Sequence, residues 1–217
     1  MDVKINAKLN GRYLSDNSIR LELINEAYKK YLEIEQKKFE IEKDMIDEHT
    51  KFYLNGYGND IQLINCLSEV MFRSRELLDS LLWMLNKITK GKTSKNFLKF
   101  SKALMNGEYD EFEIGILEVL KANISFIFHI RKIRNEIKNK PSNIKFRIVT
   151  DHLQCYFELP IKSDEKEFIS KYIVFKNKEE GLNKGAYFCT LKLKQWFLDL
   201  MGFWDHIFRI IKNDSRI

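Results

Sequence analysis

A dense basic segment is the part of the sequence best suited to bind a polyanion. Between His129 and Arg147 the chain carries seven Lys or Arg residues against one acid, so this segment alone accounts for the net charge of +6. Positive charge at this density neutralises phosphates and releases their counterions, which favours contact with nucleic acid. The alternative is a solvated helix end, because cations near a helix C-terminus also interact favourably with the helix dipole.

Within this segment, Arg131, Arg134 and Lys138 fall on one flank of a predicted helix, at about 100° per residue. Arg134 lies only about 40° from the apolar Ile130, at the border of the buried stripe. An arginine at such a border packs its aliphatic stem and keeps its planar guanidinium fork available. We therefore predict that Arg131, Arg134 and Lys138 bind nucleic acid.

A second polar pair borders the apolar face of the preceding long helix. Arg75 and Asp79 are four residues apart, as in an ordinary salt bridge within a helix. Two long helices with polar residues at the edges of their facing stripes could instead meet to form a polar cleft. The sequence leaves both interpretations open.

These two segments resemble motifs of the HEPN superfamily. Arg134-Asn-Glu-Ile-Lys-Asn139 is similar to its Arg-polar-x-x-x-His signature, and Arg75-Glu-Leu-Leu-Asp79 is similar to an Arg-x-x-Leu-Asp segment of several branches. The resemblance covers mainly residues 61–140. It implies a four-helix bundle that dimerises across a shared cleft. It also implies a metal-independent ribonuclease of toxin–antitoxin, phage-defence or RNA-processing systems.

In that family the Arg stabilises charge on the scissile phosphate, and the His moves a proton of the attacking or leaving hydroxyl. Carried over, Arg134 and Asn135 match the signature, but Asn139 stands where the His would be. An amide has no titratable proton near neutral pH. Because general acid–base catalysis contributes about 10²–10⁴-fold in rate, we expect weak or lost nuclease activity.

Other side chains could take over the proton transfer. His152, at the predicted hairpin turn, and Lys138 are the two candidates, and the sequence does not decide the role of His152. His129 precedes Arg134 by five residues, about 140° around the helix, and is poorly placed.

The elements that must position these residues are mostly helical. With only 9 Gly and 2 Pro, the chain favours long uninterrupted elements. Apolar periodicity predicts helices over 15–50, 61–88, 94–105, 111–140 and 190–211. Alternation at Phe146, Ile148, Cys155 and Phe157 predicts an antiparallel hairpin with these side chains facing inward, and Tyr172–Phe175 is a candidate third strand.

We therefore predict a mainly α fold in a single domain, residues 1–217. It would be a HEPN-like bundle of four or five helices (15–140 and 190–213), with a small antiparallel β insertion at about 144–176 before the last helix. Trp196, Phe197, Phe203, Trp204 and Phe208 fall at helical spacing and are expected in the core.

The sequence also argues against several classes of protein. The three Cys and four His have no metal-ligand spacing, and no phosphate-binding Gly-rich loop is present, so we expect no metal and no cofactor. Without a signal sequence or an apolar run of membrane-spanning length, we expect a cytoplasmic protein with no membrane contact.

The first functional hypothesis is a HEPN-like, RNA-associated protein of a bacterial defence or stress type, with weak or lost endoribonuclease activity. We expect a homodimer, with RNA and an antitoxin or defence protein as partners. The alternative is a non-catalytic dimeric protein-interaction module whose basic helix end meets an acidic partner. A working nuclease that uses His152 or Lys138 ranks below both.

Overall fold

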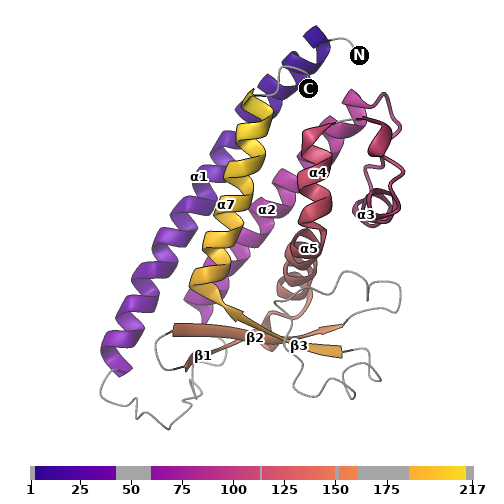
Figure 1. Cartoon of the computed structure of the whole chain (residues 1–217). Helices are drawn as coiled ribbons and strands as arrows, with labels where there is room; N and C mark the ends of the chain where they lie inside the picture. Colours follow the sequence, from indigo (N-terminus) through magenta and orange to yellow (C-terminus); the bar gives the residue numbers. More distant parts are fainter. Residues whose placement is uncertain (1–2, 43–59, 113, 150–151, 161–185, 214–217) are drawn as a thin grey trace.

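The protein is a mainly helical bundle with a small β-sheet at one end (Figure 1). The computed structural model describes residues 3–42, 60–112, 114–149, 152–160 and 186–213. The helices are α1 (Val3–Glu42), α2 (Ile61–Ile88), α3 (Phe97–Met105), α4 (Gly115–Ala122), α5 (Ile124–Asn139) and α7 (Leu193–Asn213). The strands are β1 (Lys145–Val149), β2 (His152–Pro160) and β3 (Ala186–Lys192), and short 3₁₀ turns lie at Asp110–Phe112 and Pro141–Asn143.

Helix α2 is the central helix of the bundle, with α1 packed along one side and α5 along another. It begins at Ile61 because the side chain of Asp60 accepts a hydrogen bond from the backbone N–H of Leu63 at 3.0 Å. Its bounds are those that the apolar periodicity predicts. The indole Nε1 of Trp204 in α7 donates to Ser74 Oγ at 3.3 Å, which ties the last helix to α2.

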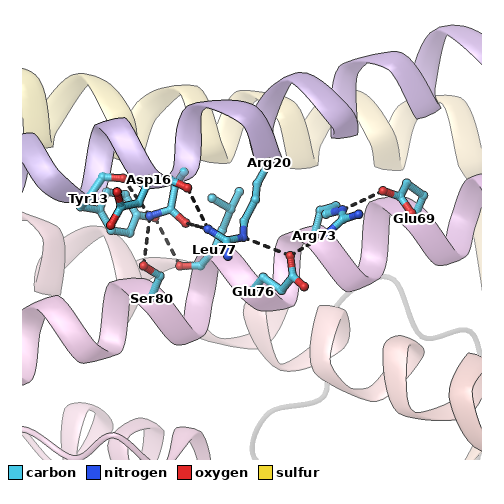
Figure 2. A network of polar contacts seen from close by, with 9 residues as sticks. Tyr13, Asp16, Arg20, Glu69, Arg73, Glu76, Leu77 and Ser80 are labelled. Atoms are coloured by element: carbon cyan, nitrogen blue, oxygen red, sulfur yellow. Dashed lines mark hydrogen bonds and ion pairs between the residues drawn. The ribbon is translucent and has the colours of Figure 1, made fainter.

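A polar network fixes α1 against α2 (Figure 2). The buried Asn17 donates from Nδ2 to the carbonyl oxygen of Tyr13 at 2.8 Å and to Ser80 Oγ at 3.0 Å. Arg20 donates to Asn17 Oδ1 at 3.0 Å and to Glu76 Oε2 at 3.1 Å. These contacts set the register of the two helices, because each buried polar atom meets a partner only in this alignment.

Helix α1 begins well before the predicted start at residue 15. The reason is that a buried polar residue, Asn10, interrupts the apolar stripe before residue 15. Residues 43–50 of the predicted helix lie outside the described residues.

The predicted helix over 111–140 is wrong in two respects. It starts at Gly115, because residues 111–112 belong to the 3₁₀ turn, and it is two helices that meet at Asn123. The side chain of Asn123 donates to the carbonyl oxygen of Val119 at 2.9 Å, and its backbone departs from helical geometry at φ −112° and ψ 15°. The apolar stripe stays buried on both sides of this break, from Leu117 to Ile137. The second helix ends at Asn139, just before the predicted proline stop.

The sheet has the order β1-β2-β3, and all its strands are antiparallel. Phe146 of β1 lies opposite Cys155 of β2, and both are buried, as predicted. The side chains of Ile148 and Phe157 are not among those the structure describes, and Tyr172–Phe175 lies outside the described residues.

The third described strand is Ala186–Lys192, so the β insertion extends beyond residue 176 and the last helix starts at Leu193 rather than 190. This strand forms against β2, a partner distant in sequence, so local periodicity does not reveal it. Trp196, Phe197, Phe203 and Trp204 of α7 are buried, as predicted, and Phe208 is partly buried against the same core.

Candidate functional site

The polar residues singled out on α2 and α5 lie close together. Arg75 Nη2 pairs with Asp79 Oδ1 at 2.7 Å on α2. The positive charges of Arg131 and Arg134 on α5 act electrostatically on both members of this pair. The two helices therefore bring one acid and three guanidinium groups to a single place, the arginine cluster: Arg75, Asp79, Arg131 and Arg134.

Aromatic rings support the three guanidinium groups. The ring of Phe97, the first residue of α3, lies 5.6 Å from the guanidinium carbon of Arg75 and 5.7 Å from that of Arg131. The ring of Phe72 in α2 lies 4.8 Å from that of Arg134. An arginine held against an aromatic ring gains a cation–π interaction and keeps its N–H edge directed elsewhere. The rings thus restrain the guanidinium groups of the cluster.

The cluster is electrostatically strained. Burial lowers the pKa of Arg75, and the neighbouring charges of Arg131 and Arg134 lower it further, whereas Asp79 raises it. Burial also raises the pKa of Asp79, against the opposing effect of the three arginines. Arginine remains protonated in proteins. The four groups therefore hold three positive charges and one negative charge in a partly buried position.

Two donors of the cluster have no acceptor within the described structure: Arg75 Nη1 and Arg134 Nε are both buried there without a hydrogen bond. Arg134 Nη1 does donate to Asn135 Oδ1, at 3.2 Å. A buried donor without an acceptor costs about 1–3 kcal/mol, more when it is charged. The cluster is therefore suited to an acceptor from beyond the described residues, and an anion suits it best.

The remaining predicted site residues lie toward the end of α5. Lys138 is exposed one turn beyond Arg134, and Asn139 is the exposed last residue of the helix. Asn139 is about 140° around the helix axis from Arg134. Helix α5 alone therefore places Asn135, but not Asn139, beside the guanidinium group of Arg134.

The described histidines differ sharply in environment. His129 is fully buried on α5, and burial lowers its pKa to about 4, so it is neutral at physiological pH. His206 is exposed on α7, far along the chain from the cluster. His152 is the first residue of β2, opposite Val149, and the structure does not assign it a role.

The rings of Phe72 and Phe97 were not recognised from the sequence as part of the site. Asn96 caps α3 through a hydrogen bond from the backbone N–H of Lys99, which fixes where Phe97 begins the helix. A capping residue followed by an aromatic predicts a helix start, but it does not predict which helices that aromatic contacts.

The described part of the chain holds no group of three or more His, Cys, Asp or Glu side chains arranged to bind a metal ion. None of the helices within the described ranges is long and apolar enough to cross a membrane. No family model matches the sequence, and no curated protein or solved structure is significantly similar to it.

Proposed function

We propose that the protein is a HEPN-like, RNA-associated protein of a bacterial defence or stress type, with weak or lost metal-independent endoribonuclease activity. The observation that supports this most is the arginine cluster. Arg75 and Asp79 of α2 lie with Arg131 and Arg134 of α5, so both motifs of the family resemblance contribute to one site.

Phosphate is the chemistry that fits this cluster. Guanidinium groups present several N–H donors in a fixed plane and bind phosphate oxygens through paired, charge-assisted hydrogen bonds. Exposed Lys138 lies one turn further along α5 and adds positive charge at the helix end. An RNA strand would neutralise the excess charge and supply acceptors for the donors that lack them.

Within the described residues, the site lacks an evident group for proton transfer in catalysis. Asn139 carries no titratable proton, and the nearest histidine along α5, His129, is buried and neutral. Arg134 could still stabilise charge on a phosphate, but no histidine whose side chain the structure describes lies beside it to move a proton at neutral pH. Binding without efficient cleavage is the activity that this combination supports.

The proposal includes a cytoplasmic homodimer with an antitoxin or defence protein as partner. Two-fold symmetry would place two arginine clusters in one assembly and double the positive surface offered to RNA.

The test is binding of a fluorescently labelled single-stranded RNA, followed by anisotropy over a range of KCl concentrations. Each phosphate contact contributes about −0.7 to the slope of log affinity against log salt for single strands. We expect Arg134→Ala to weaken binding and to reduce the slope by about one contact. Arg209→Ala removes the same side chain from an exposed position on α7 and is the matched control.

Equal RNA binding by wild type and Arg134→Ala would place the RNA site elsewhere. Absence of any salt-dependent RNA binding would contradict the proposal and favour the protein-interaction alternative.

A further inference from the structure

We propose that the exposed indole ring of Trp83 on α2 stacks against a base of single-stranded RNA, about two helical turns from Arg75 of the arginine cluster. The inference rests on the proposed function and adds a second contact to it, one that recognises a base rather than a phosphate. Its basis is the exposure of the ring, the cavity beside it and the cations around it.

Trp83 differs from the other two tryptophans of the chain in its exposure to solvent. It is 39% exposed, whereas Trp196 and Trp204 of α7 are buried in the core. Its neighbours Leu82 and Met84 on α2 are buried, so the packing of this helix does not depend on the indole in the same way. The ring is therefore accessible to a ligand.

A cavity of about 150 Å³ lies beside this ring, between α1 and α2. Leu9 and Tyr13 of α1 and Met84 of α2 line it together with Trp83. An apolar cavity of this volume holds one aromatic ring. The cavity thus admits a base or a single aromatic side chain, and the charges around it decide between the two.

These charges favour a polyanion. The guanidinium carbon of Arg12 in α1 lies 5.9 Å from the centroid of the Trp83 ring, and Nζ of Lys87, one turn further along α2, lies 5.6 Å from it. Asp16 is the acid that lines the cavity, and it pairs with Arg12 at 3.3 Å. Both members of this pair are more than half exposed, so water weakens their attraction and a phosphate can compete for the guanidinium group. Exposed Lys8, one turn before Arg12, adds a further positive charge.

The cations do not prevent a base from reaching the ring. The side chains of Arg12 and Lys87 are both exposed. A cation–π contact at an exposed site is weaker than the stacking of a base on an aromatic ring, so a base can take the place of either cation. The displaced cation stays beside the strand, where it can bind a phosphate next to the stacked base.

The position of Trp83 on α2 lets one strand reach both the ring and the arginine cluster. Four residues of α2 follow one another at intervals of four: Arg75, Asp79, Trp83 and Lys87. Each interval turns the helix by about 40° and advances it by about 6 Å, so Arg75 and Trp83 are about 12 Å apart along the axis. Asp79, which lies between them, is paired with Arg75. An RNA strand that binds Arg75 through a phosphate can therefore place a nearby base on Trp83.

The experiment compares two strands of equal length: a single-stranded RNA, and a strand with the same backbone in which abasic sites replace the bases. Anisotropy of a terminal label at fixed KCl concentration measures affinity. We expect Trp83→Ala to weaken binding of the RNA roughly 5- to 150-fold, the range for loss of one stacked base, and to leave binding of the abasic strand unchanged. Trp83→Phe keeps a ring and should retain most of the affinity. Leu198→Ala, at an exposed apolar position on α7, is the matched control.

Tryptophan fluorescence provides a readout that a merely structural role would not change. Because Trp196 and Trp204 are buried, Trp83 is the tryptophan most accessible to acrylamide. Bound RNA should quench the emission of Trp83 and protect it from acrylamide, whereas the abasic strand should do neither. Thermal melting of Trp83→Ala establishes that this variant is folded.

Unchanged affinity of Trp83→Ala for the RNA would overturn the inference and leave the proposed function intact, and so would equal affinity of the wild type for the two strands. A dimeric wild type and a monomeric Trp83→Ala in sedimentation would also overturn it, because the ring would then belong to an interface between two copies of the chain. Failure of the wild type to bind the RNA at all would contradict the proposed function itself.

Discussion

The guanidinium carbon of Arg134 lies 4.8 Å from the centroid of the Phe72 ring. Arg134 belongs to α5 and Phe72 to α2, so the position of the charge on one helix depends on an aromatic side chain of the other. The same helix α2 carries Arg75 and Asp79. The packing of α2 against α5 therefore assembles the site.

Replacing Phe72 by Leu should weaken RNA binding with little loss of stability. An exposed or partly exposed cation–π contact is worth about 0.5–1 kcal/mol, which corresponds to roughly a 2- to 5-fold loss of affinity. Phe72→Tyr keeps the ring and should bind as wild type does. Phe112→Leu removes the ring beneath Lys92 instead and serves as the control for loss of an aromatic elsewhere. A Phe72→Leu variant with unchanged affinity would contradict a positioning role for the ring.

Replacing Asp79 by Asn should strengthen binding of RNA severalfold at neutral pH. The carboxylate of Asp79 occupies Arg75 and competes with an incoming phosphate, and an amide of the same shape removes this competition. Burial raises the pKa of Asp79, so the carboxylate is less favourable in the folded protein than in the unfolded chain. Its replacement by an amide should therefore not lower the melting temperature at pH 7. Asp205→Asn, at an exposed position on α7, is the control for a change in net charge. Weaker RNA binding by Asp79→Asn would show that the carboxylate organises the site rather than blocks it.

Helix α2 shows what the sequence can predict about this fold. Its apolar stripe is uninterrupted and its capping residue Asp60 stands directly before it, so local signals determine both its ends. The start of α1 was missed because the buried Asn10 interrupts the apolar stripe before residue 15. Strand β3 was missed because it forms beside β2, a partner distant in the chain.

The candidate site also has residues that the sequence identifies and residues that it does not. Arg134 and the pair Arg75–Asp79 stand at the borders of apolar stripes, and this local position is compatible both with a cleft between two facing helices and with an ordinary salt bridge within α2. Phe97 reaches the cluster from α3 through the connection between α2 and α3, whose course no local pattern predicts. The charged side chains were therefore identified as candidates from the sequence, but their meeting and the rings that support them were not predicted.

Replacing Asn17 by Ala should destabilise the protein by about 1–3 kcal/mol, because the amide satisfies buried groups of both helices. Asn17 donates to the Tyr13 carbonyl oxygen and to Ser80 Oγ, and it accepts from Arg20. Chemical denaturation measures the free energy of unfolding, and Ser18→Ala, at an exposed neighbouring position, is the control. A loss no larger than that of the control would show that the network does not hold α1 on α2.

Acidification from pH 6.5 to 4 should reduce stability through His129. Burial lowers the pKa of His129 from 6.5 to about 4 in the folded protein. Between these values the unfolded chain takes up a proton that the folded protein does not, so stability is fully present above pH 6.5 and falls as the pH drops. The size of this effect is on the order of 3 kcal/mol.

Urea unfolding at several pH values measures this dependence. His129→Gln should be less stable at pH 7 but should lose less stability between pH 6.5 and 4. His206→Gln, at an exposed position, should follow the wild-type dependence. If the free energy of unfolding of wild type and of His129→Gln changed with pH in parallel, His129 would not be the group responsible for the loss of stability.

The last prediction concerns the missing proton carrier. Wild-type protein should cleave RNA weakly or not at all, and Asn139→His should raise cleavage because it supplies an imidazole with a pKa near neutrality. General acid–base catalysis sets the upper range of this gain at about 10²–10⁴-fold. Addition of Arg134→Ala to this variant should abolish the gain, because nothing would then stabilise charge on the phosphate.

The geometry of α5 adds a sharper form of this test. Position 139 lies about 140° around the helix from Arg134, so the introduced imidazole should serve the arginine of a second protomer rather than its own. The double variant Arg134→Ala/Asn139→His and the wild type should each cleave poorly alone. After mixing and subunit exchange, heterodimers should form in which one protomer supplies Arg134 and the other supplies the imidazole, and these heterodimers should cleave a labelled RNA.

No cleavage after mixing, while Asn139→His alone is active, would show that both groups act within one chain. Strong cleavage by the wild type that persists in Arg134→Ala would place the catalytic site elsewhere in the molecule.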